Sequence, residues 1–204
     1  MENIPAIISA LGVIITAWFS YNQYTKNKKT DLKIEQFHNQ QKKRTKENME
    51  ILATIYGELW MTLYSLRADR VYILQPHPAS KNLFISITVE VKKKGVSAMK
   101  HNIDSVPMSE VPMLAYRLAK EDFVLWNNAS IARMIDKRIS SIMSISGTLS
   151  VSAAKMVNQE KHWIGNVVAE HTQNDCNDCG QCEDVMRDLA KQIQTILPDY
   201  ETIL

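Results

Sequence analysis

The first 25 residues contain an uncharged, apolar segment. No charged side chain occurs between Asn3 and Thr25, and residues 4–19 are almost entirely apolar. A membrane-spanning helix needs about 20 apolar residues, so the pattern predicts a transmembrane anchor over residues 1–25. A cleaved signal peptide and a buried core helix are the alternatives, disfavoured by the missing basic n-region and by the lysines that follow directly. The side chains expected to form the anchor are Ile4, Ile7, Ile8, Leu11, Val13, Ile14, Ile15, Trp18, Phe19 and Tyr21.

The segment after the anchor is polar and strongly basic. Residues 26–46 carry eight basic and two acidic side chains, which predicts a helical stalk or linker over residues 26–47, ahead of a soluble domain at 48–204. Positively charged flanks stay on the cytoplasmic side of a membrane, so we expect a single-pass inner-membrane protein with a cytoplasmic soluble domain. The side chains expected to rest on the anionic headgroups of the lipid bilayer are Lys26, Lys28, Lys29 and Lys33.

Helical periodicity marks both ends of the soluble domain. Apolar residues recur every three or four positions from Leu52 to Leu66, which predicts an amphipathic helix. The same spacing from Val185 to Ile196 predicts a C-terminal helix that Pro198 ends.

Between these helices the pattern favours strands. Leu83–Val91 alternates apolar and polar positions throughout, which predicts a half-buried strand with all its apolar side chains on one face. Val71–Gln75 predicts a shorter strand, antiparallel to the first because their connection is short. The fold class is therefore α+β, an antiparallel sheet with helices packed at its N- and C-terminal ends. Further strands are expected at Asp122–Trp126, Ser141–Ile145, Thr148–Ala153 and Trp163–Glu170, and a helix at Val111–Leu118.

Composition and charge exclude several classes of protein. With 45% hydrophobic residues and only six glycines and six prolines, the chain is neither disordered nor fibrous. Residues 47–204 hold 16 basic and 19 acidic side chains, so no nucleic-acid partner is expected. Phosphate-binding, zinc-protease and nucleophile-elbow motifs are absent from the sequence, which favours a protein that is not an enzyme.

The only local cluster with metal chemistry is the run of three cysteines near the C-terminus. Cys176, Cys179 and Cys182 stand three residues apart, and thiolates at this spacing can hold zinc or an iron–sulfur cluster. His171 or Asp175 could supply a fourth ligand. A disulfide or redox pair and inert loop thiols are the alternatives, so zinc is one candidate and the cofactor is otherwise unknown.

The order of elements resembles that of GAF and PAS domains. The likeness is strongest over Asp69–Glu90, DRVYILQPHPASKNLFISITVE, where a hairpin follows the first helix. The resemblance implies a sheet domain that can hold a small ligand. In that case Arg70, Tyr72 and Phe84 are the residues expected to line the pocket.

The whole layout also resembles the single-pass T-type holins of T-even phages. Such holins join a short N-terminus, one membrane helix, a polar helix and a GAF/PAS-like domain in the periplasm. The resemblance implies a protein that self-assembles in the inner membrane for host lysis, as a homo-oligomer controlled by its soluble domain or by a regulatory protein partner. The alternative is a membrane-tethered GAF-like sensory or protein-interaction module that binds a small ligand or a partner protein. The residues that carry the holin resemblance are Ala68-Asp69, Tyr72, Lys81-Asn82-Leu83, Glu90, Trp163–Glu170, Leu189-Ala190 and Ile196.

Overall fold

The computed structural model describes residues 18, 23, 42–79, 82–134, 136–173 and 179–197. The predicted anchor, apart from Trp18 and Gln23, and the four lysines predicted to lie on the membrane are outside the described residues. Within the part of the chain that is described, no helix has the length and apolar character needed to cross a membrane. The chain divides into two compact units, Met1–Glu50 and Ile51–Leu204, and the fold below is that of the second unit.

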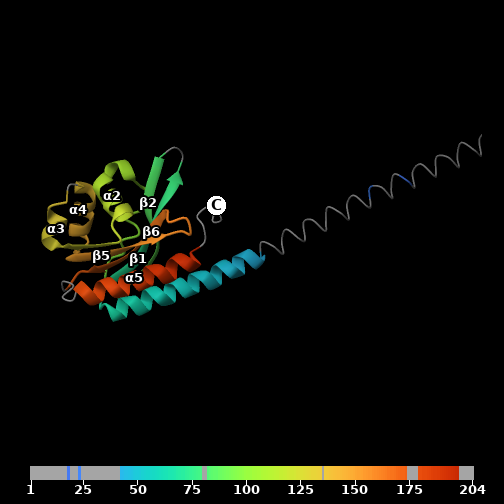
Figure 1. Ribbon diagram of the computed structural model, residues 1–204, viewed down its shortest axis with the longest axis horizontal. Coiled ribbons are helices and arrows are strands. Elements are labelled where there is room, and N and C mark those ends of the chain that lie inside the picture. The colour runs from blue at the N-terminus through green and yellow to red at the C-terminus, as the bar shows by residue number, and fades with distance from the viewer. Residues whose placement is uncertain are drawn as a thin grey trace, which may run out of the picture. The chain divides into compact units, whose positions relative to one another are not determined.

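Six antiparallel strands form one sheet in the order β3-β2-β1-β6-β5-β4 (Figure 1). The first strand and the last strand pair at its centre, with Arg70 opposite Glu170. This pairing joins a hairpin from each half of the domain into one sheet. The strands are β1 (Arg70–Ala79), β2 (Asn82–Lys92), β3 (Val106–Pro107), β4 (Phe123–Asn127), β5 (Ser150–Val157) and β6 (Trp163–His171).

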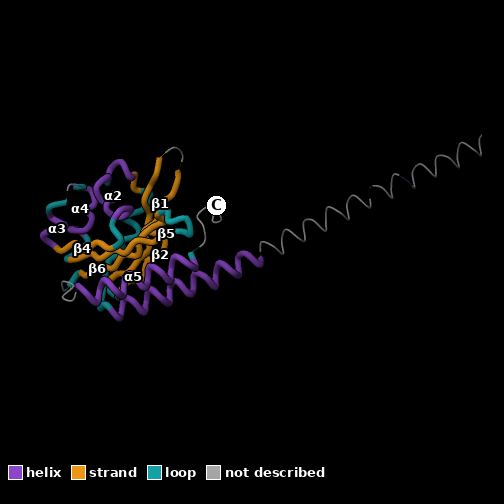
Figure 2. Tube along the Cα trace, in the orientation of Figure 1, coloured by secondary structure: helices purple, strands orange, loops and turns teal. Residues whose placement is uncertain are grey.

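Helices cover both faces of the sheet. The helix over residues 51–65, called the N-terminal helix below, runs beside α5 under one face (Figure 2). The other face carries α2, α3 and α4 together with the loop over residues 93–105. The α+β class and the antiparallel sheet are thus confirmed. The remaining helices are η1 (Met108–Glu110), α2 (Pro112–Lys120), α3 (Asn128–Ala132), α4 (Lys137–Ile145) and α5 (Cys179–Ile196).

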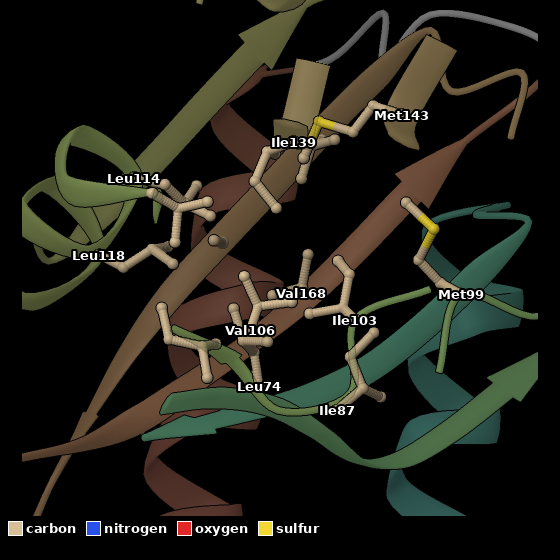
Figure 3. Close-up of a cluster of buried hydrophobic side chains, with 14 of the residues drawn as sticks. Leu74, Ile87, Met99, Ile103, Val106, Leu114, Leu118, Ile139, Met143 and Val168 are labelled. Carbon is tan, nitrogen blue, oxygen red and sulfur yellow. The ribbon is translucent and has the colours of Figure 1, made fainter. Parts of the chain in front are cut away.

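Each face of the sheet has its own apolar core. Under the first face, Leu59 and Leu63 of the N-terminal helix pack with Ile193 of α5. On the second face, side chains from α2 and α4, such as Leu118 and Ile139, gather with Val168 of the sheet (Figure 3). Burial of these apolar surfaces is the main force that holds the helices against the sheet.

The predicted one-sided alternation of Leu83–Val91 is wrong because β2 contains a bulge. The pairing with β1 passes from Ile73 opposite Val89 to Leu74 opposite Ile87, which leaves Thr88 as an extra residue. An extra residue moves the side chains that follow to the opposite face of a sheet. Ile87 therefore lies in the core beneath α2 and α4, whereas Val89 lies in the core beneath α5.

The predicted strand at Ser141–Ile145 is also wrong, because these residues are the second half of α4. A short apolar run does not distinguish a strand from a buried helical turn by periodicity alone. The Ser146-Gly147 pair, interpreted as a hairpin turn, ends this helix. Gly147 has a φ of 70°, and the amide of Thr148 donates to the carbonyl of Met143 at 2.9 Å, a Schellman C-cap.

A substitution at Gly165 in β6 tests the closeness of the central strands. Gly165 has a φ of 147°, and a Cβ atom there would lie 2.6 Å from the carbonyl oxygen of Leu74. We expect Gly165→Ala to lower the free energy of unfolding by about 1–3 kcal/mol in chemical denaturation. Gly57→Ala is the control, since a Cβ atom there has nothing within 4 Å and is expected to stabilise the helix slightly. Equal effects of the two substitutions would contradict the backbone geometry.

Candidate functional site

A buried ionic network lies where β1 and β6 pair. Arg70 and Glu170 are both fully buried, and Nη2 of Arg70 lies 2.6 Å from Oε2 of Glu170. Tyr72 donates its hydroxyl proton to Oε1 of Glu170 at 2.5 Å. Thr148 accepts from Arg70 at 2.8 Å and donates to Glu170 at 2.9 Å. These contacts compensate both charges within the core.

The same arginine ties two loops to the sheet. Arg70 donates to the carbonyl oxygen of Ser97 at 3.1 Å and to that of Ser146 at 3.3 Å. Its Nε atom is buried and has no hydrogen-bond partner among the described residues. Burial, followed by the charge of Glu170, raises the pKa of Tyr72 well above its usual value. Tyr72 therefore remains a protonated donor at neutral pH.

The predicted pocket residues separate into two places. Arg70 and Tyr72 belong to the ionic network, whereas Phe84 is half-buried in the β1–β2 hairpin. The ring of Phe84 stacks on His77 with a centroid distance of 5.8 Å. The structure thus brings Arg70 and Tyr72 together but leaves Phe84 apart, and a ligand at any of the three stays a prediction.

The predicted metal ligands are described only in part. Cys176 lies outside the described residues, the side chain of Cys179 is not described, and Cys182 is buried in the core beneath α5. His171 ends β6, with Nε2 at 3.2 Å from the carbonyl oxygen of Leu66. Its buried Nδ1 has no hydrogen-bond partner in the described part of the chain. No cluster of three ligating side chains occurs among the described residues, so the zinc site stays a prediction.

A polar hollow of about 310 Å³ lies next to His171. Asp69 in this hollow is paired with Lys93 at 2.9 Å and accepts from the amides of Thr172 and Gln173 at 2.7 and 3.2 Å. Burial alone would raise the pKa of Asp69, but the hydrogen bonds from Thr172 and Lys93 outweigh it, so the pKa is lowered. The carboxylate therefore holds the start of β1 to the end of β6.

A second cavity, of about 200 Å³, opens between α2, β4 and α3. Its walls are mostly apolar, and Leu114 and Trp126 are buried within them. The guanidinium of Arg117 lies 5.0 Å from the centre of the Trp126 ring. The lining residues are Met113, Leu114, Arg117, Trp126, Ser130, Arg133, Met134 and Asp136.

The cavity between α2, β4 and α3 is called the α2–α3 cavity below. The charged groups around it differ in their hydrogen-bond and ion-pair partners. Glu121 accepts two hydrogen bonds from Arg117, at 2.6 and 2.9 Å, and this pairing lowers the pKa of Glu121. Asp136 is buried and accepts from the amides of Leu114 and Met113 at 2.5 and 3.4 Å, so it caps α2. Arg133 is exposed at the rim and makes no ion pair within the described ranges.

Sequence reasoning missed the α2–α3 cavity. The helix at Val111–Leu118 and the strand at Asp122–Trp126 are confirmed, and together they carry Arg117 and Trp126. The segment over residues 130–139, however, showed no pattern that places it against α2. Tertiary contacts, such as that between Asp136 and the start of α2, bring the walls of the cavity together.

Comparison with known proteins identifies the fold. No protein-family profile and no curated protein sequence matches the chain. A domain of a two-component sensor histidine kinase protein from Sinorhizobium meliloti 1021 is 12% identical, covers 74% of this chain and 93% of its own, and has a TM-score of 0.56. The photoproduct state of a GAF domain from Synechocystis sp. PCC6803 is 11% identical, covers 75% and 95%, and has a TM-score of 0.58.

A third similar structure is a far-red-absorbing dark state with bound biliverdin IXa. It is 10% identical, covers 74% of this chain and 97% of its own, and has a TM-score of 0.53. Identities this low establish the fold alone. The chain therefore has a GAF-like fold, as the order of its elements predicted, and nothing in the comparisons supports the holin-like role.

Asp69→Asn tests the role of the carboxylate that joins β1 to β6. The pKa of this group is lowered in the folded state, so its stabilisation is present above the unfolded-state pKa of about 4 and is lost as the pH falls. We expect Asp69→Asn to lower the free energy of unfolding by about 1–3 kcal/mol at pH 7. This difference in stability between variant and wild type should shrink below about pH 4. Urea unfolding of both proteins between these pH values measures the difference in stability. A difference that is independent of pH would contradict the stabilising role of the ionised Asp69 carboxylate.

Proposed function

We propose that the chain is a membrane-tethered GAF-like sensory module that works as a homodimer formed through its N-terminal helix. The GAF-like fold supports the sensory role, because this fold is shared here with a sensor histidine kinase domain and a GAF domain studied in a photoproduct state. The tether is the apolar segment over residues 1–25, which stays a prediction from the sequence, as does the side of the membrane.

A row of exposed apolar side chains carries the dimer proposal. Along the N-terminal helix, Leu52, Tyr56, Trp60 and Tyr64 follow one another at intervals of four, with 38–68% of each exposed. Trp60 and Tyr64 stack with a ring-centroid distance of 5.7 Å. The opposite side of this helix is buried against the sheet. An apolar row of this kind on an otherwise packed domain is typical of a protein–protein contact.

A second copy of the chain is the occupant that fits this row best. The four side chains of the row are uncharged, so two identical rows can face each other across a two-fold axis without like charges meeting. Two parallel copies of the helix also begin at the same end, as two anchors in one membrane require. The neighbouring α5 has a different exposed surface, with the ion pairs Glu183–Arg187 and Asp188–Lys191, which suits solvent.

The residues present do not fit a bilin such as the biliverdin of the third similar structure. Apolar side chains including Leu74, Ile87 and Val168 fill the sheet face beneath α2 and α4 (Figure 3). The α2–α3 cavity measures about 200 Å³ and the hollow beside His171 about 310 Å³, below and at the lower end of the roughly 300–1,000 Å³ of typical cofactor sites. The input of this module is therefore a smaller molecule or a protein partner. A catalytic role is not part of the proposal.

The dimer is tested with the full chain in detergent or lipid nanodiscs, by light scattering after size-exclusion chromatography. We expect wild type to be a dimer and Tyr56→Glu/Trp60→Glu to be a monomer. The loss of one central Trp from an interface lowers the binding free energy by about 2 kcal/mol or more, which corresponds to a roughly 30-fold weaker dimer. Tyr116→Glu is the matched control, since Tyr116 is 58% exposed on α2, and it should remain dimeric.

Two results would overturn the proposed function. A wild-type chain that stays monomeric at every concentration tested would remove the dimer. Loss of membrane potential at a sharp time after induction in cells would instead favour the holin-like role. A wild-type far-UV circular dichroism spectrum and a single cooperative unfolding transition in the monomeric variant would show that the glutamates act on the contact and not on the fold, because loss of the dimer alone lowers the unfolding temperature.

A further inference from the structure

The geometry points to the α2–α3 cavity as a binding site for a small aromatic carboxylate, a single ring with one acidic group. This ligand would be the input of the sensory module, and in that respect the inference rests on the proposed function. The described residues that line the site nevertheless belong to one copy of the chain, on α2, β4, α3 and the segment that leads to α4.

The size and lining of the cavity favour one aromatic ring. Apolar cavities of about 150 Å³ bind benzene, and this cavity of about 200 Å³ has room for a ring with a short substituent. Trp126 lines the cavity, with Arg117 over one face of its indole, and the thioether side chains of Met113 and Met134 line it as well. Sulfur–aromatic contacts and offset ring stacking both stabilise a bound aromatic group.

The charges around the cavity favour an acidic substituent. Arg133 is the cation at the rim that no described carboxylate neutralises. The carboxylate of Asp136 also lines the cavity, but both of its oxygens accept amide protons from the start of α2. Asp136 is therefore committed to the helix and compensated by its N-terminal dipole. A carboxylate beside Arg133 would gain a charge-assisted, bidentate hydrogen-bond partner.

The walls of the site are fixed before a ligand arrives. Trp126 is held in β4, opposite Val151 of β5. Arg117 is clamped by Glu121 over the indole face, so one side of the ring system is closed. The side-chain oxygen of Asn127 caps α3, because it accepts from the amide of Ser130 at 2.9 Å and from its hydroxyl at 2.8 Å. Arg133 and the half-exposed Met113 stand at the opening, where an incoming ligand meets them first.

The test uses the full chain in detergent, labelled with 5-fluorotryptophan. The sequence contains four tryptophans, and the ¹⁹F signal of Trp126 is assigned from its loss in Trp126→Phe. Benzoate, neutral benzamide and ringless acetate are titrated separately. We expect benzoate to shift the Trp126 signal selectively with a dissociation constant on the order of 0.1–1 mM. Benzamide should bind at least tenfold more weakly and acetate should cause no selective shift.

Two arginine variants separate binding from folding. Arg133→Gln should weaken benzoate about tenfold while leaving benzamide unchanged. Arg187→Gln, which changes a partly exposed arginine on α5 that is not among the cavity's lining residues, should alter neither. No Trp126 shift with benzoate up to about 10 mM, equal affinity for benzamide, or an equal effect of both variants would overturn the site. The ¹⁹F signal of Trp126 reports binding whether the chain is a monomer or a dimer. A negative binding result therefore does not contradict the dimer, and a monomeric wild type does not contradict this binding site.

Discussion

The buried ion pair between Arg70 and Glu170 is the contact on which the rest of the domain depends. It joins the first strand of the sheet to the last, at the seam between two hairpins. A buried charge without its partner costs several kcal/mol, so only the register that places these two side chains opposite each other is stable. Tyr72 and Thr148 complete the pair with hydrogen bonds to Glu170. One polar network thus selects the register of the central strands.

That network also shapes the rest of the face that α2 and α4 cover. Arg70 donates hydrogen bonds to the carbonyl groups of Ser97 and Ser146. These bonds hold the loop after β2 and the C-terminal end of α4 against the sheet. The apolar side chains between these points close over the sheet centre. On this face the described space lies at the side, in the α2–α3 cavity, and a ligand that entered it would be much smaller than a tetrapyrrole.

The sequence pattern predicted helices and strands correctly where one periodicity dominated. It failed where tertiary contacts determined the local structure. The terminal helices and most strands follow from period-3.6 and period-2 patterns, and the structure confirms them. The bulge at Thr88 left no local signal, because the polar residue fits a regular strand equally well. The second half of α4, Ser141–Ile145, was predicted as a strand because its apolar run is short, and only Gly147 and the cap at Thr148 identify the end of the helix. Arg70 and Tyr72, which the sequence predicted in a ligand pocket, lie together in the buried network, but their partner Glu170 is 98 residues further along the chain from Tyr72.

A double-mutant cycle at the central ion pair tests this account most directly. Arg70→Met, Glu170→Gln and the double variant are compared with wild type by urea unfolding of the full chain in detergent. The account predicts that each single substitution lowers the free energy of unfolding by about 3–5 kcal/mol. The decrease in the double variant should be smaller than the sum of the two single decreases by at least about 2 kcal/mol. Losses that add to within about 0.5 kcal/mol would show that the two side chains stabilise the sheet independently, and would contradict the central role of their pairing.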